Sequence, residues 1–120
     1  MKSINELLPL LDNLKTEENL DGIIFAYRDG ELIAKNVEDE FNGKAFLSMC
    51  ASVLESAVGI GDTIGDQKIN KIIVELDEKT ILLVECDNIT FLVLIINPES
   101  NVSNILRKLD EIIQKIVKMY

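Results

Sequence analysis

The sequence contains no histidine and no tryptophan, and aromatic residues make up only 5% of its 120 residues. Histidine is the side chain most often used for acid–base catalysis near neutral pH, and it is a common zinc ligand. The chain has only two cysteines, Cys50 and Cys86, which lie far apart and in no metal-binding spacing. We therefore expect two small buried thiols in a reducing compartment, and neither a metal nor a cofactor.

Basic residues are also scarce, with 12 Lys and Arg against 21 Asp and Glu and a formal net charge of −9. Such an excess of negative charge repels phosphate backbones and anionic lipid surfaces. Asn5, Glu6 and Pro9 interrupt any leader-like apolar region, and no uncharged apolar run approaches the ~20 residues of a membrane span. The sequence thus predicts a cytoplasmic protein that neither binds nucleic acid nor inserts into a membrane.

Aliphatic residues are abundant, since 48% of the chain is hydrophobic. This length supports one sizeable core, so we predict a single domain over residues 1–120. Two apolar runs, 23–28 and 31–36, flank Asp29-Gly30, a pair typical of a two-residue hairpin turn.

Three further runs, 71–76, 80–86 and 90–96, are separated by turns short enough for antiparallel hairpins. The last run is apolar on both of its alternating faces. A strand of this kind needs cover above and below, so we predict that it is central, with helices on each side of the sheet.

Helical spacing of apolar residues occurs in three places. The first helix follows a capping box at Ser3 to Glu6, and Pro9 means that it either starts near Leu8 or is kinked. The second helix runs from about Gly43 to Ile60 after a cap at Asn42, and the third covers residues 102–117. The prediction is a five-stranded antiparallel sheet in an α/β (α+β) layered domain, with one helix on one face and two on the other.

The second helix is almost bare of charge, because residues 48–61 include only Glu55. A helix that packs on one face of a sheet requires only one apolar stripe, whereas this helix has two neighbouring stripes. We predict that the surplus packs against a second copy of the chain. The alternative is a neutral solvated face, with the third helix folding over the rest. The two stripes are Phe46, Cys50, Val53, Ala57 and Ile60, and Leu47, Ala51, Leu54 and Val58; the remaining face has the small residues Ser48, Ser52, Ser56 and Gly59.

No motif indicates an enzyme. The glycines at 59, 61 and 65 follow a helix rather than a strand, so we expect them to end that helix rather than hold a phosphate. Cys50 lies among apolar neighbours, which makes it a poor nucleophile. Arg28 is placed to act as an arginine finger toward a partner, although an ordinary surface arginine is the simpler interpretation. We expect a non-catalytic protein.

The ordered combination of these segments resembles the Roadblock/LC7 family over nearly the whole chain. DGIIFAYRDGELIAKN is similar to the first hairpin of the family, and AFLSMCASVLESAVGIG to its small-residue central helix. TILLVECDNITFLVLI resembles the strand pair before the last helix, and NVSNILRKL resembles the start of that helix. Profilin-like folds share part of this layered architecture.

The resemblance implies a dimer in which the central helices pack together and the third strands join two sheets into one. Family members regulate or scaffold small Ras-like GTPases, and eukaryotic relatives are dynein light chains. It leaves open whether the partner is a second copy or a related Roadblock chain, and where a GTPase docks. Two alternatives are a small-molecule sensor of PAS or GAF type and a purely structural self-associating scaffold. The interface implied here contains Leu47, Ser48, Ala51, Ser52, Glu55, Ser56 and Gly59 of the helix, and Lys71, Ile73 and Glu75 of the edge strand.

Overall fold

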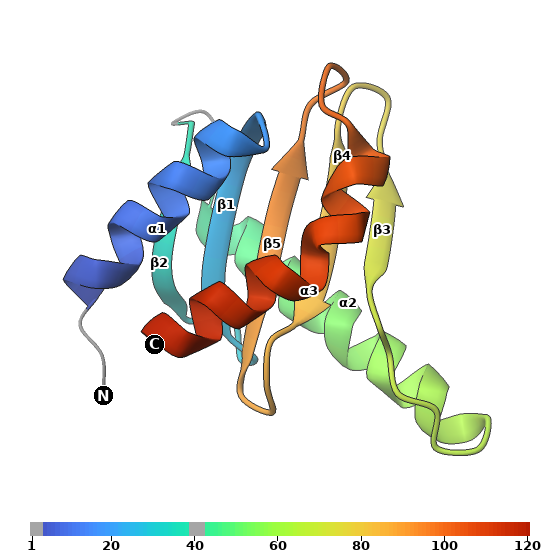
Figure 1. The fold of residues 1–120 in the computed structure, drawn as a ribbon. Helices are drawn as coiled ribbons and strands as arrows, with labels where there is room; N and C mark the ends of the chain where they lie inside the picture. The colour runs from blue at the N-terminus through green and yellow to red at the C-terminus, as the bar shows by residue number, and fades with distance from the viewer. Residues whose placement is uncertain (1–3, 39–42) are drawn as a thin grey trace.

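The computed structural model describes residues 4–38 and 43–120. Its element order, α-β-β-α-β-β-β-α, confirms the predicted order (Figure 1). The predicted caps at Ser3 and Asn42 lie outside the described residues. The elements are α1 (Ile4–Glu17), β1 (Leu20–Tyr27), β2 (Leu32–Val37), α2 (Gly43–Thr63), β3 (Ile72–Glu75), β4 (Thr80–Glu85), β5 (Thr90–Ile96) and α3 (Val102–Met119).

The five strands form one antiparallel sheet in the order β2-β1-β5-β4-β3. All seven residues of β5 are buried, which confirms the prediction of a central strand. Its side chains alternate between the two faces, because successive residues of a strand point in opposite directions. Leu92, Leu94 and Ile96 therefore join one core cluster, while Phe91, Val93 and Ile95 join the other.

The two clusters define the layers of the fold. The sheet side of Leu92, Leu94 and Ile96 is covered by α1 and α3, and the other side by α2 (Figure 1). Fully burying one such aliphatic side chain contributes about 1.5–3 kcal/mol. The predicted fold class is confirmed, with one helix on one face and two on the other.

The first helix runs through Pro9 instead of starting near Leu8. Proline is costly inside a helix because it lacks an N–H and crowds the preceding turn. Here Pro9 is exposed, whereas Leu7, Leu11 and Leu14 are buried against the sheet. The ring therefore lies on the outer side of α1 and leaves the packing side intact.

The first hairpin is confirmed, but its connection is longer than a two-residue turn. β1 ends at Tyr27 and β2 begins at Leu32. The Arg28 N–H donates to the carbonyl of Ile89 at 2.8 Å, so Arg28 bonds to the neighbouring β4–β5 connection instead of to β2. Gly30 has φ +94°, a value that glycine adopts without strain.

The helix α2 ends at Thr63, three residues beyond the predicted end at Ile60. The following segment turns back tightly, and the Gln67 N–H donates to the Gly61 carbonyl at 2.9 Å. A Cβ at Gly61 would lie 2.1 Å from the Gln67 carbonyl oxygen, so the close approach requires glycine there. Gly65 follows with φ +96°, in keeping with a glycine that stops a helix.

Candidate functional site on the central helix

The outer side of α2 is apolar and nearly uncharged. The only charged residues of α2 are Lys44, Glu55 and Asp62. Met49 is 68% exposed, Val53 42% and Ile60 63%, although each is a large hydrophobic residue. Single exposed hydrophobic residues are ordinary, but a run of them along one helix face marks an interaction surface. We call Met49, Ser52, Val53, Ser56 and Ile60 the outer face of α2.

The inner side of α2 packs on the sheet through four buried residues drawn from both predicted stripes. These residues are Leu47, Cys50, Ala51 and Leu54. Val53 and Ile60, which belong to the first of the two stripes, are exposed. Two adjacent stripes look alike in sequence, and the helix contacts the sheet along the boundary between them.

The predicted interface residues of the helix fall into two groups. Ser48, Ser52, Glu55, Ser56 and Gly59 are exposed. Leu47 and Ala51 are only 5% and 8% exposed, because they already pack against the chain's own sheet. Leu47 and Ala51 therefore belong to the contact between α2 and the sheet and not to the exposed surface. The interface as a whole stays a prediction.

Met49 is the residue that sequence reasoning missed. It lies one turn before Val53 on the same side of α2, since residues four apart are neighbours on a helix surface. The i, i+4 pair of Met49 and Val53 was the available signal. It was hidden because the serines three or four apart were taken to define the outward face alone.

By length and composition α2 could cross a membrane, and only 22% of its most apolar window is buried. A helix wholly inside a core is apolar on all sides because it is covered on all sides. The core helix of a soluble protein passes the same test of length and composition, so the prediction of no membrane insertion stays a prediction. What α2 shows directly is one packed side and one apolar side that residues 4–38 and 43–120 leave uncovered.

The third helix does not fold over this surface. It packs on the opposite side of the sheet, with Ile105, Leu109, Ile112 and Ile116 in the cluster that contains α1 (Figure 1). That part of the alternative interpretation was wrong. The outer face of α2 is left to water or to another molecule.

The edge strand β3 lies next to the far end of α2, which runs past it in Figure 1. Within the described residues, β3 pairs with β4 alone, so the backbone groups along its other side have no strand partner. Ile73 is 43% exposed and Glu75 is exposed, while Lys71 lies just before the strand. An unpaired edge of this kind is a template for pairing with another chain.

The groups considered for chemistry are engaged or unreactive. The Arg28 guanidinium is bound to the Glu85 carboxylate, with Nη1 and Oε2 2.5 Å apart, so it is held within its own chain rather than extended as a finger. Burial raises the pKa of the Cys50 thiol to about 11, and burial together with the charge of Asp87 raises that of Cys86 to about 12. Both cysteines are therefore thiols at neutral pH. Across residues 4–38 and 43–120, no group of three or more metal-ligating side chains is close enough to hold an ion.

No protein-family model and no curated protein sequence matches this chain. Solved structures do match it. MglB of Myxococcus xanthus superposes with a TM-score of 0.87 at 14% identity, covering 95% of this chain and 94% of that one. A Roadblock/LC7 domain from Streptomyces avermitilis has a TM-score of 0.82 at 14% identity, with 91% and 92% covered. The chain has the Roadblock/LC7 fold.

Two further structures extend this comparison. An MglB described as having a tetrameric arrangement matches the Roadblock-fold chain with a TM-score of 0.86 at 10% identity, covering 96% of this chain and 88% of that one. A Schizosaccharomyces pombe profilin matches less closely, with a TM-score of 0.66 at 15% identity over 93% and 97% of the two chains. The predicted profilin-like architecture is thus confirmed, and the resemblance seen in the sequence is confirmed at the level of the fold.

Proposed function

We propose that this Roadblock-fold chain forms a cytoplasmic dimer, with itself or a related Roadblock chain, and that the dimer is a non-catalytic adaptor or regulator of a small Ras-like GTPase. The observation that carries the proposal is the outer face of α2 beside the unpaired edge of β3. A second copy related by a two-fold axis covers both surfaces at once, because the same patch meets itself.

Residue chemistry supports close packing of two α2 helices. Ser48, Ser52, Ser56 and Gly59 are small and exposed, so they allow another backbone to approach. Met49 and Ile60 then supply apolar area, at 68% and 63% exposure. Burying the exposed part of each contributes about 1–2 kcal/mol, counted twice in a symmetric pair.

The structural neighbours support a regulatory assignment. They include MglB and a Roadblock/LC7 domain, and one MglB is described in a tetrameric arrangement. The family resemblance implies contact with a Ras-like GTPase. Arg28, the residue considered as an arginine finger, is bound to Glu85 of its own chain, so the proposed action does not use it in a partner's active site. The action of the chain on a GTPase then consists of binding one nucleotide state in preference to the other, or of ordering the GTPase's own groups.

Self-association is tested first by light scattering of the purified chain across micromolar concentrations. We expect a dimer, and a Ser52→Lys variant that is monomeric because two ammonium groups would be buried at the contact. Ser103→Lys is the matched control, since Ser103 is exposed on α3 on the other side of the sheet. A parent chain that stays monomeric throughout would overturn the homodimer.

GTPase binding is tested with Ras-like GTPases from the same organism, each loaded with GDP or with a non-hydrolysable GTP analogue. We expect capture of one GTPase with a preference of about tenfold or more for one nucleotide state, which corresponds to about 1.4 kcal/mol. Equal binding of both states argues against regulation and for an adaptor. A dimer that binds no GTPase in either state supports the purely structural scaffold instead.

A further inference from the structure

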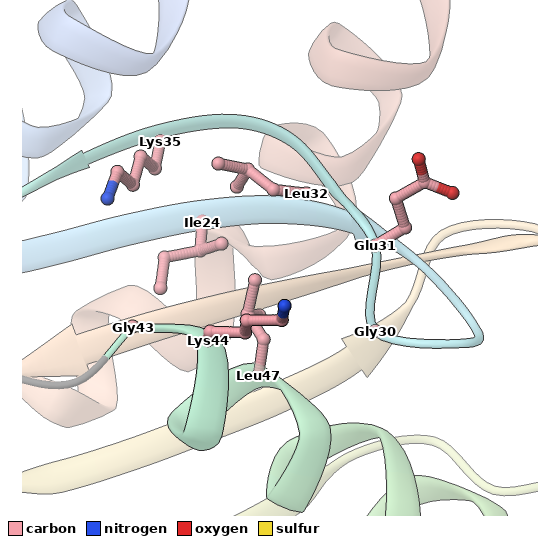
Figure 2. Close-up of a pocket in the computed structure, with 8 residues that line it drawn as sticks. All are labelled: Ile24, Gly30, Glu31, Leu32, Lys35, Gly43, Lys44 and Leu47. Carbon is pink, nitrogen blue, oxygen red and sulfur yellow. The ribbon is translucent and has the colours of Figure 1, made fainter.

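A groove lies at the opposite edge of the sheet from β3, between β2 and the first turns of α2 (Figure 2). Its volume is about 390 Å³, which falls in the range of small-molecule sites. Eight residues line it: Ile24, Gly30, Glu31, Leu32, Lys35, Gly43, Lys44 and Leu47.

The sheet register explains why the groove exists. Lys35 pairs with Ile24, so both side chains lie on the face that α2 covers. The β1–β2 turn then closes one end, because a Cβ at Gly30 would lie 3.5 Å from the Leu47 carbonyl oxygen of α2. Leu32, at 43% exposure, remains open to solvent at the sheet edge.

The lining combines an apolar floor with two cations. Ile24 and Leu47 are buried. In Figure 2 Ile24 lies between the side chains of Lys35 and Lys44, Leu47 lies beside Lys44, and the ammonium groups of the two lysines point in different directions. The carboxylate of Glu31 points away from them. Neither Lys35 nor Lys44 forms an ion pair with another described residue.

Lys35 and Lys44 are distinguished by lining one groove together. Lacking an ion pair is a property they share with other described basic residues, namely Lys15, Lys68, Lys71, Arg107 and Lys118. Arg28, Lys79, Lys108 and Lys115 each form an ion pair with a carboxylate, and the formal net charge of the chain is −9. Two ammonium groups that no described residue neutralises, beside the exposed apolar side chain of Leu32, are complementary to a molecule with one negative end and one apolar end. A charge-assisted contact to an ammonium is about twice as strong as a neutral hydrogen bond.

We propose that this groove binds a small amphipathic carboxylate of the medium-chain fatty-acid class. The alkyl chain lies on the floor formed by Ile24, Leu32 and Leu47, and the carboxylate is held by the lysines that line the groove. The site is separate from the outer face of α2 and does not depend on GTPase binding. It gives the fold a ligand pocket at the sheet edge, distinct from the central cavity expected of a PAS- or GAF-type sensor.

The test is a titration of the isotope-labelled full-length chain with sodium octanoate, followed by proton–nitrogen correlation NMR. We expect saturable shifts centred on the amides of Ile24, Leu32, Lys35 and Lys44. 1-Octanol has the same alkyl length without the charge and should bind about tenfold more weakly or worse. Shifts that appear instead on Met49, Val53 and Ile60, with octanol as effective as octanoate, would mean nonspecific adsorption to the outer face of α2 and would overturn the proposal.

Matched variants separate the lysines from net charge. In Lys35→Gln/Lys44→Gln the octanoate dissociation constant should rise about tenfold or more. Lys68→Gln/Lys118→Gln removes the same charge at exposed positions outside the groove and should leave it unchanged. An equal loss in both variants would show that only overall charge matters, and no saturable shift in the parent would show that no such site exists.

Discussion

A cluster of polar side chains ties together the sheet end where β1 begins, β5 ends and β3 turns into β4. The Asp21 carboxylate is bound by the Lys79 ammonium and accepts a hydrogen bond from Asn97 Nδ2 at 3.1 Å. The Lys79 hydrogen bond is the largest influence on Asp21 and lowers the pKa of its carboxyl below the ordinary value of 3.8. We predict that replacing Asp21 with Asn destabilises the fold in a pH-dependent way.

The magnitude follows from exposure. The Asp21 side chain is 22% exposed and that of Lys79 is 49% exposed, so solvent screens the pair. Exposed pairs contribute about 0.2–1 kcal/mol, and we expect about 1 kcal/mol here because Asp21 is the more buried partner. For a chain of this size that loss lowers the melting temperature by about 4 °C.

The direction of the pH dependence follows from the linkage between protonation and folding. A carboxyl whose pKa is lower in the folded state stabilises the fold above its unfolded pKa, and this stability is lost as pH falls through the folded pKa. Urea unfolding at fixed protein concentration should therefore show the full difference between parent and Asp21→Asn at about pH 7, and a much smaller one near about pH 3.

The control is the same substitution in a Lys79→Met background. There Asp21→Asn should cost almost nothing at neutral pH, since the ion pair is already gone. An equal loss at both pH values, or in both backgrounds, would refute the assignment of this stability to the charge on Asp21.

Three further predictions test the surfaces and the core. Met49→Lys should raise the dimer dissociation constant about a hundredfold or more, because it buries a charge at the contact. Val117→Lys, at a position that is 38% exposed on α3, should leave that constant unchanged. Equal effects of the two variants in light scattering would contradict this prediction. Leu94→Ala should cost about 3 kcal/mol in urea unfolding because Leu94 is fully buried, against less than about 1 kcal/mol for the half-exposed Leu8→Ala. Cys50 should react with iodoacetamide near about pH 8 far more slowly in the native chain than in urea, and rapid native alkylation would contradict its raised pKa.

Much of the fold follows from local patterns. The alternation in residues 90–96 identified a strand apolar on both faces, and the structure buries all seven of its residues at the sheet centre. Asp29-Gly30 located the first hairpin, although its connection is longer because Arg28 bonds to Ile89. These features depend on periods of two or 3.6 residues, which are visible within a short window.

The candidate surfaces were only partly visible in the sequence. The scarcity of charge along α2 predicted an interaction helix, but not which of two adjacent stripes lies against the sheet. That choice depends on how α2 crosses strands that are distant in sequence. In the structure Met49 and Val53 are exposed, whereas Leu47 and Ala51 are buried against the sheet. The groove was not visible at all, because Ile24, Lys35 and Lys44 meet only through strand register and the docking of α2.

The sequence by itself determined the order of the elements, the central strand and the scarcity of charge on α2, since each follows from residues that are close together in the chain. Only the tertiary structure decided which side of α2 is exposed, that Arg28 is bound to Glu85, and that two lysines share one groove. Such pairings join residues far apart in the chain. They are set by packing and register, in which every element influences every other.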